Sequence, residues 1–276
     1  MSTAEGDDQD LTRKQRRDQA REERRELEQA HAANAMRRTR LIQLGVVGVI
    51  VVGIIIGIVA ATSGGKKTTI TKVHSSEATA LINEVSSQIG GIPQHANTLG
   101  SPTAPVTLQY FGDLECPVCR SFTEGALKPL IESDVRSGKL KVEYRALQTA
   151  TPEAEVFKTQ QVAALAAGKQ QKAWYYIELF YHQQGEEKSG YVTESYLQGL
   201  AQQVPGLNVT KWASDRSNPE LASAVAADGQ AANSLGFTGT PSFTIGKTGG
   251  AQKKFEAGSY TDPSSFEAEV EKLIKG

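Results

Sequence analysis

The sequence has few of the side chains that bind metals or cross-link small secreted domains. Its 276 residues include only two cysteines and four histidines. Small secreted scaffolds spread many cysteines along the chain as cross-links, so that class is excluded. A structural zinc site needs four ligands, and there is no second cysteine pair to supply them. The histidines also lack ligand spacing with the cysteines; they are His31, His74, His95 and His182. We therefore expect no metal site.

The chain also lacks a large net charge. Its 30 basic and 31 acidic residues leave a formal charge of −1. Proteins that hold nucleic acid through bulk charge are strongly basic, so we expect no nucleic-acid partner. The charges are unevenly distributed, however. Residues 1–40 are highly charged, residues 41–62 carry no charge, and the remainder has ordinary globular composition.

The uncharged run at 41–62 is long enough to cross a bilayer as a helix, which takes about 20 apolar residues. It exceeds the apolar core of a usual signal peptide, about 7–15 residues, so an uncleaved anchor is favoured over a cleaved leader. Arg37, Arg38 and Arg40 stand directly before it. By the positive-inside rule, the N-terminus is cytoplasmic and the larger C-terminal part is extracytoplasmic. We predict a single-pass protein of the cell membrane.

Four parts are expected along the chain. Residues 1–40 form a charged cytoplasmic tail, interpreted as solvated and partly helical rather than as an interaction helix. Residues 41–62 form the transmembrane helix, and residues 63–90 form a spacer with one helical patch at 78–89. Residues 91–276 form the folded domain.

The apolar pattern of the folded domain predicts an α/β arrangement. Residues 106–111 and 140–147 have the composition of strands, and residues 117–136 between them have helical spacing, which makes a βαβ unit. The elements expected after it are helices over 153–184, 193–203, 209–216 and 219–235, strands over 242–245 and 253–256, and a closing helix over 263–274. The order is βαβ, a helical block, then ββα.

Both cysteines fall at the first strand-to-helix turn, in the run ECPVCR that starts at residue 115. A disulfide between them closes almost no loop, so it would add little stability as a brace. Cys116 is expected at the helix N-cap, with Pro117 at the first helical position, where a missing N–H costs nothing. The free amides and the helix dipole favour a thiolate there, and such placement can lower a cysteine pKa to between roughly 3.5 and 7.5. Cys116 is therefore the expected nucleophile, and Cys119, one turn deeper, the resolving thiol.

Two segments together carry a family resemblance. The run FGDLECPVC at 111–119, followed far downstream by GTPSF at 239–243, resembles the DsbA-like thioredoxin family. It is most similar to the membrane-anchored bacterial group that forms extracytoplasmic disulfides, over roughly residues 90–275. The resemblance implies a thioredoxin fold with a helical insertion between its βαβ and ββα halves. It also implies that Pro241 is cis and lies against the active-site disulfide, although only about 5–6% of X–Pro bonds are cis. By the same analogy, the backbone of Thr240 pairs with an extended substrate.

The resemblance implies a protein disulfide oxidoreductase acting on extracytoplasmic protein thiols and disulfides. Its only redox group would be the Cys116–Cys119 disulfide, with no organic cofactor or metal. A quinone-linked membrane protein would reoxidise it. The sequence departs from the best-known oxidase pattern at Val118, where that pattern has histidine. Valine can neither donate a hydrogen bond nor carry charge, so we expect a less stabilised Cys116 thiolate and a less oxidising pair. Pro117, Val118 and Thr240 are the positions expected to tune it.

Other functional classes stay open from the sequence. A reductase or isomerase of the same fold would need a transmembrane electron donor. A non-catalytic, membrane-tethered peptide-binding or chaperone module would keep the fold without turnover, although both cysteines are retained. A Cys–His hydrolase using His182 is disfavoured because Cys119 would trap the nucleophile as a disulfide.

Two other groups of residues near or beyond the cysteines are interpreted as structural and not as functional. The carboxylates of Asp113 and Glu115, beside the cysteines, are interpreted as solvated loop groups rather than as proton relays. The aromatic cluster from Trp174 to Tyr181 has helical spacing and is interpreted as core rather than as the lining of a peptide groove.

Overall fold

Residues 75–276 are the part of the chain that the structure, a computed structural model, describes. The predicted tail at 1–40, the predicted transmembrane helix at 41–62 and the first residues of the predicted spacer lie outside this range. Within the described range, every helix is too short or too polar to span a membrane.

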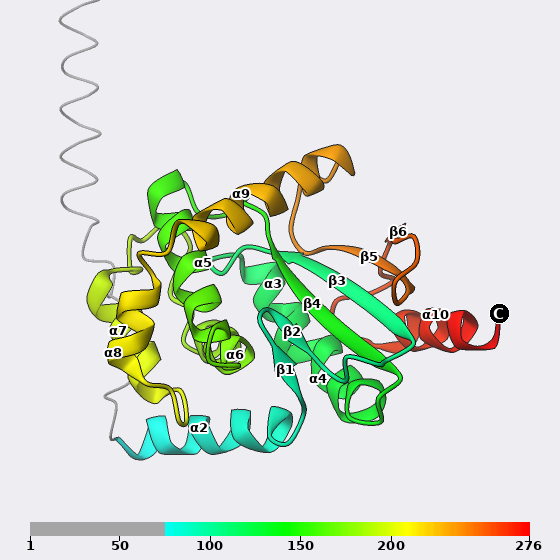
Figure 1. Cartoon of the computed structure of the whole chain (residues 1–276), viewed down its shortest axis with the longest axis horizontal. Coiled ribbons are helices and arrows are strands. Elements are labelled where there is room, and N and C mark those ends of the chain that lie inside the picture. The colour runs from blue at the N-terminus through cyan, green and yellow to red at the C-terminus, as the bar shows by residue number, and fades with distance from the viewer. Residues whose placement is uncertain (1–74) are drawn as a thin grey trace, which may run out of the picture. The chain divides into compact units, whose positions relative to one another are not determined.

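A six-stranded mixed sheet forms the centre of the described domain, in the order β1-β2-β4-β3-β5-β6 (Figure 1). The strands are β1 Gln94–His95, β2 Thr98–Leu99, β3 Val106–Gly112, β4 Leu140–Ala146, β5 Ser242–Lys247 and β6 Lys253–Phe255. Strand β3 pairs in parallel with β4 and antiparallel with β5. Six of the seven residues of β3 are buried, which explains its almost continuous apolar run.

Nine α-helices accompany the sheet in residues 75–276. They are α2 Ser76–Ile89, α3 Pro117–Phe122, α4 Lys128–Leu130, α5 Ala154–Gly168, α6 Ala173–His182, α7 Glu194–Gln203, α8 Val209–Asp215, α9 Pro219–Ser234 and α10 Ser264–Lys275. Helices α5 to α9 lie between β4 and β5 in the chain, and Figure 1 shows α5 to α8 gathered beside the sheet. The predicted order of a βαβ half, a helical insertion and a ββα half is confirmed.

The helix that follows the cysteines is not the regular helix expected over 117–136. Helices α3 and α4 are joined by a wide π-helical turn at Thr123–Leu127, and a second one follows at Ile131–Val135. Pro129 lies between the two turns and has no N–H to donate. Its ring would also clash with the carbonyl group four residues earlier, and a widened turn relieves that clash.

The helical region expected over 153–184 is divided into α5 and α6. The chain turns at Gln171, whose φ of 58° lies in the left-handed region. Just before the turn, Gly168 packs so closely on the neighbouring loop that a Cβ atom there would lie 2.7 Å from the carbonyl oxygen of Ala96. A right-handed helix cannot continue through this conformation of Gln171, so α5 and α6 are separate helices, and the spacing of apolar residues does not indicate the break.

The helix α2 corrects the expected domain boundary. The sequence places its residues in a spacer with one helical patch, but Val85 and Ile89 are fully buried in the main core. Arg136, from the end of the cysteine-bearing helical segment, donates hydrogen bonds to the carbonyl groups of Gln88 and Gly90 at 2.7 and 3.0 Å. The folded domain therefore begins at α2 and not at residue 91.

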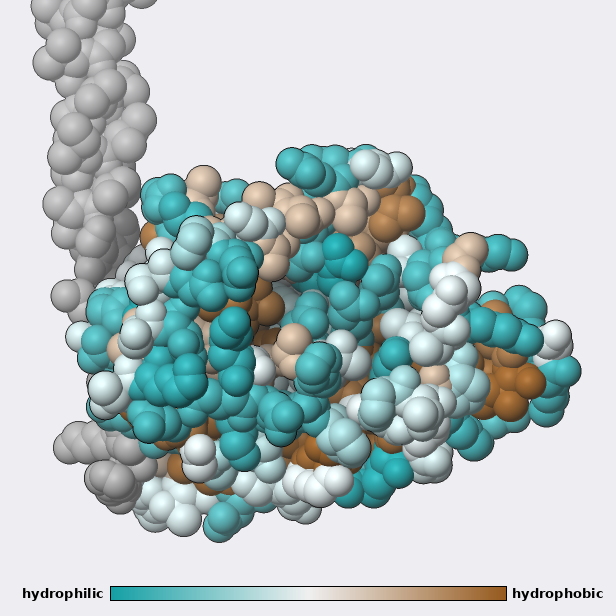
Figure 2. Space-filling model, viewed as in Figure 1, coloured by the Kyte–Doolittle hydropathy of each residue, from teal (hydrophilic) through white to brown (hydrophobic). Residues whose placement is uncertain are grey.

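The two faces of the sheet are covered differently. Leu108 and Tyr110 of β3 face the main core, whereas Phe111 belongs to a small second cluster with Leu147 and Ala232 of α9. The aromatic cluster on α6 is core as predicted, since four of its members are fully buried: Trp174, Tyr176, Phe180 and Tyr181. Hydrophilic side chains cover most of the face seen in Figure 2.

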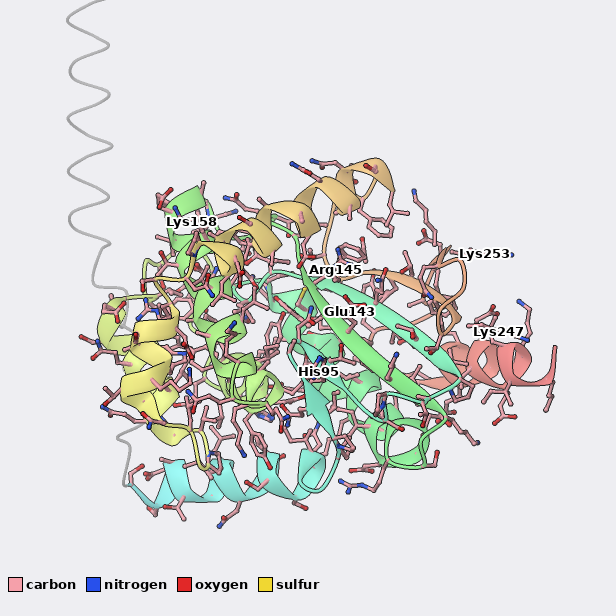
Figure 3. All side chains as sticks on the ribbon, viewed as in Figure 1. His95, Glu143, Arg145, Lys158, Lys247 and Lys253 are labelled. Atoms are coloured by element: carbon pink, nitrogen blue, oxygen red, sulfur yellow. The ribbon has the colours of Figure 1, made fainter. Side chains whose placement is uncertain are left out.

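Helix α9 is held to β4 by polar contacts. Asp228 accepts a hydrogen bond from the backbone N–H of Ala146 at 2.9 Å and forms an ion pair with Arg145. Glu143 lies 3.5 Å from the same guanidinium group, and Figure 3 shows both labelled side chains close together on β4. These contacts fix the insertion on the sheet near the C-terminal end of β4.

Candidate active site

The two cysteines lie at the N-terminus of α3. Cys116 is the N-cap, and its Sγ accepts a hydrogen bond from the backbone N–H of Cys119 at 3.4 Å. Pro117 occupies the first turn, where the helix has no use for an N–H. Cys116 is 6% exposed and Cys119 is completely buried, and both are free thiols in the structure. Attack from outside can therefore reach only Cys116.

The surroundings give the two thiols opposite acidities. Hydrogen bonding with Cys119 lowers the pKa of Cys116 to about 6, with further hydrogen bonds from Thr240 and from the backbone of Cys119 and Val118, against an opposing effect of burial. Burial, together with the hydrogen bond and charge of Cys116, raises the pKa of Cys119 well above its usual value. At neutral pH the reduced pair therefore holds a thiolate at Cys116 and a protonated thiol at Cys119.

The loop before β5 brings Thr240 against Cys116, and Pro241 follows it in the chain. The Thr240–Pro241 peptide bond is cis. The Cys116 thiol donates a hydrogen bond to the carbonyl oxygen of Thr240 at 3.4 Å. On the other side, Val118 is 43% exposed, so it forms part of the surface that a substrate would meet. Of the six site positions predicted from the sequence, four lie at the start of α3, and Thr240 and Pro241 lie on the cis-proline loop that contacts Cys116.

Asp113 and Glu115 correct the sequence interpretation, because both are buried and not solvated. The carboxylate of Asp113 accepts hydrogen bonds from five groups on two loops. One oxygen of Glu115 is buried without a hydrogen-bond partner. Burial, followed by the charge of Asp113, raises the pKa of Glu115 to about 7. The Glu115 carboxyl therefore titrates near neutral pH, one residue from Cys116.

Two residues that follow or belong to α6 donate hydrogen bonds to the backbone of the cysteine turn, and the sequence did not predict these contacts. The Gln184 side chain donates to the carbonyl groups of Leu114 and Cys116 at 2.7 and 3.1 Å. The Tyr181 hydroxyl donates to the carbonyl oxygen of Asp113 at 3.2 Å. These partners are about 70 residues away along the chain, so local spacing carries no signal for them.

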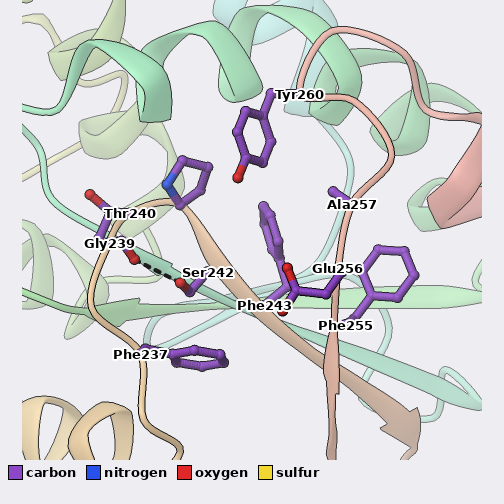
Figure 4. Close-up of a pocket in the computed structure, with 10 residues that line it drawn as sticks. Phe237, Gly239, Thr240, Ser242, Phe243, Phe255, Glu256, Ala257 and Tyr260 are labelled. Atoms are coloured by element: carbon purple, nitrogen blue, oxygen red, sulfur yellow. Dashed lines mark hydrogen bonds between the residues drawn. The ribbon is translucent and has the colours of Figure 1, made fainter.

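A groove opens beside the cis-proline loop (Figure 4). It has a volume of about 170 Å³ and lies between the loop at 239–243 and the segment at 255–257. Tyr260, which is 38% exposed, and Phe243 project into it, while Glu256 supplies a carboxylate at its edge. Thr240 lines the groove, and its carbonyl oxygen lies 3.4 Å from Cys116 Sγ, so the groove opens beside the sulfur.

His182 is engaged away from the cysteines. Its ring lies 3.7 Å from Glu124 and 3.9 Å from Glu178. Across residues 75–276, no three His, Cys, Asp or Glu side chains are grouped closely enough to hold a metal ion.

The sequence profile of the thioredoxin family matches residues 94–259, which is more than half of the chain. This chain is a DsbA-like member of the thioredoxin family. The probable disulfide bond formation protein D of Bacillus cereus is 26% identical over 213 residues, covering 76% of this chain and 90% of that protein. The protein of the same name from Bacillus anthracis is 24% identical over 155 residues, covering 54% of this chain and 68% of that protein.

Solved structures share the DsbA-like fold. Oxidised BdbD from Bacillus subtilis superposes with a TM-score of 0.56 at 20% identity, over 68% of this chain and 99% of that one. The α-DsbA1 of Wolbachia pipientis gives a TM-score of 0.52 at 19% identity, over 65% and 90% of the two chains. The family, the named relatives and the pair of cysteines together identify this chain as a protein disulfide oxidoreductase.

Proposed function

We propose that this oxidoreductase is a membrane-anchored dithiol oxidase, which introduces disulfides into extracytoplasmic proteins through Cys116 and Cys119. The observation that carries the proposal is the unequal pair of thiols. Cys116 has a lowered pKa and keeps 6% of its surface exposed, whereas Cys119 has a raised pKa and is completely buried. This division is what a nucleophile and a resolving thiol need.

The reaction starts from the Cys116–Cys119 disulfide. A substrate thiolate attacks Cys116 Sγ, the enzyme disulfide breaks, and Cys119 departs and takes a proton. A second substrate thiolate then attacks the substrate sulfur of the mixed disulfide and releases Cys116 as a thiolate. Two electrons have passed from the substrate dithiol to the enzyme, and the substrate holds a new disulfide. The low pKa of Cys116 makes it the better leaving group in this second step.

The oxidising direction is favoured by the same acidity. A stabilised Cys116 thiolate stabilises the reduced enzyme, and a stable reduced form makes the disulfide a stronger oxidant. The relatives named disulfide bond formation protein D agree with this direction. Val118 argues for a weaker oxidant, because it adds no hydrogen bond or charge. A reductase or isomerase supplied by a transmembrane electron donor is therefore the second candidate.

Substrates would bind as extended chains along the cis-proline loop. The groove beside Thr240 and Pro241 offers aromatic surface and backbone polar groups. An extended peptide can pair with exposed backbone as an added strand, while its side chains enter neighbouring pockets. Such binding depends more on the backbone of the substrate than on its side chains, which suits an enzyme with many protein substrates.

The anchor and the redox partner complete the proposal. Residues 41–62 would hold the enzyme in the membrane with the catalytic domain extracytoplasmic. A quinone-linked membrane protein would return the Cys116–Cys119 pair to its disulfide. No organic cofactor or metal is needed, because the cysteines themselves accept the electrons.

The reduction potential of the full chain in detergent, equilibrated against glutathione buffers, tests the direction. Strong oxidants of this chemistry lie near about −120 mV and thioredoxin near about −270 mV. A value near the upper limit supports the oxidase, and a value near the lower limit favours the second candidate. Cys116→Ser should abolish exchange. Cys119→Ser should accumulate mixed disulfides with a disulfide-containing substrate, because the Cys116 thiolate attacks the substrate disulfide, releases one substrate thiolate and has no second cysteine to resolve the bond. Turnover by Cys116→Ser would refute the assignment of the pair.

A further inference from the structure

The carboxylate of Asp113 organises the loop that follows β4. Its Oδ2 atom accepts hydrogen bonds from three consecutive backbone N–H groups, those of Thr149, Ala150 and Thr151, at 2.9, 2.9 and 3.0 Å. Its Oδ1 atom accepts the Thr151 hydroxyl at 2.6 Å and the N–H of Glu115 at 3.1 Å. One buried side chain thus ties the loop at 149–151 to the cysteine turn.

The same loop reaches the cis-proline segment through a single side chain. The hydroxyl oxygen atoms of Thr149 and Thr240 lie 2.5 Å apart. Thr149 itself is exposed, so burial does not account for its position. Two threonines that are 91 residues apart in the sequence therefore meet directly beside Cys116.

Thr240 is the residue of this pair that touches the reacting sulfur. Its carbonyl oxygen lies 3.4 Å from Cys116 Sγ. That carbonyl accepts a hydrogen bond only from the protonated thiol, and it is the side chain of Thr240 whose hydrogen bonding lowers the pKa of Cys116. When Thr149 donates to the Thr240 hydroxyl oxygen, the Thr240 proton is free to point at the sulfur. A Thr240 without this partner can turn its hydroxyl toward water, and the thiolate loses part of its stabilisation.

We propose that Asp113 and Thr149 are positioning residues for the redox pair, which aim Thr240 at the sulfur of Cys116. Asp113 fixes the loop, the loop places the Thr149 hydroxyl, and that hydroxyl orients Thr240. This inference rests on the proposed role of Cys116 as nucleophile. It assigns a function in exchange to a carboxylate and a hydroxyl that do not themselves meet the substrate.

Thr149→Val is the decisive variant, because it removes the hydroxyl and keeps the backbone N–H that Asp113 holds. Thr149→Ser restores a hydroxyl and serves as the conservative rescue. Thr248→Val is the matched control. It breaks a second long-range hydroxyl pair, between Thr107 of β3 and Thr248 just after β5 at 2.8 Å, at the opposite end of β3 from the cysteines. Asp113→Asn is less decisive, since it also loosens the loop.

The full chain in detergent is assayed for the pH dependence of Cys116 alkylation, the glutathione equilibrium and thermal unfolding. Thr149→Val should lower the ionisation constant of the Cys116 thiol by about threefold to tenfold, as expected for one lost hydrogen bond. The glutathione equilibrium constant should shift by the same factor toward a more reducing pair, about 15–30 mV. Thr149→Ser should restore most of both, and Thr248→Val should leave both unchanged.

The inference is overturned if Thr149→Val changes the melting temperature alone and leaves the thiol ionisation and the glutathione equilibrium as in the wild type. The same holds if Thr248→Val changes them equally. Failure of the proposed function looks different, because the wild-type chain would then exchange no disulfides with glutathione or with a reduced protein substrate.

Discussion

The thiol of Cys116 donates a hydrogen bond to the carbonyl oxygen of Thr240 at 3.4 Å, although 124 residues separate them in the chain. The contact joins the helix N-terminus that activates the sulfur to the loop on which a substrate chain would lie. The nucleophile and the substrate platform are therefore a single structural unit. Changes on either side should alter the chemistry of the pair.

Removing the second thiol should make Cys116 less acidic. The Cys119 side chain is the largest cause of the lowered pKa of Cys116, so Cys119→Ala should raise that pKa from about 6 toward its ordinary value. Cys119→Ser keeps a donor and should give an intermediate value. The rate of iodoacetamide alkylation as a function of pH measures both. Titration curves of both variants that are identical to that of the wild type would show that helix placement, without Cys119, sets the acidity.

Introducing histidine at position 118 should make the pair more oxidising. Val118 is 43% exposed beside the sulfur, so an imidazole can be accommodated there and can donate to the thiolate. One pKa unit corresponds to about 1.4 kcal/mol, or about 30 mV for this couple, and we expect Val118→His to raise the potential by about that amount. Val118→Ala is the control without a donor. A potential that is unchanged by histidine would exclude this position as the tuning residue.

The buried carboxyl of Glu115 should make stability depend on pH. Its pKa is raised from 4.5 to about 7, so the folded state binds a proton more tightly than the unfolded state, and stability falls as pH rises between these values. The full shift would correspond to about 3 kcal/mol, and solvent screening should reduce it to about 1–2 kcal/mol. Glu115→Gln should remove this loss in urea unfolding at pH 5 and pH 8.

Glu132→Gln, at an exposed position in the π-helical turn at Ile131–Val135, is the matched control for Glu115. It should leave the pH dependence of unfolding as in the wild type. An equal loss of stability between pH 5 and pH 8 in Glu115→Gln and wild type would contradict the prediction.

Helix α2 should contribute to the stability of the domain. Ile89 is fully buried in the main core, and truncating such a side chain leaves a cavity. We expect Ile89→Ala to lower the free energy of unfolding by about 2–4 kcal/mol, measured by urea denaturation. Asn83→Ala, on the exposed face of the same helix, should change it by less than about 0.5 kcal/mol. Equal effects would mean that α2 is the spacer predicted from the sequence.

The sequence by itself determined the parts of this protein that rest on local pattern. The apolar strands at β3 and β4, the helix start at Cys116 and Pro117, and the order of the two halves follow from residue spacing within short windows. The cysteine pair indicated redox chemistry, because a disulfide that closes so short a loop adds little to the stability of the fold. The cis bond before Pro241 followed from family resemblance and not from local preference.

Only the tertiary structure decided which polar groups surround the sulfur. Asp113 and Glu115 belong to a short loop and look solvated in sequence, but the helical insertion and the loop after β4 bury both. Gln184 and Thr149 reach the site from far along the chain, and no periodicity records such contacts. Apolar spacing records which face of an element is buried, whereas a hydrogen-bond network depends on how distant elements meet, and that is settled only when they pack.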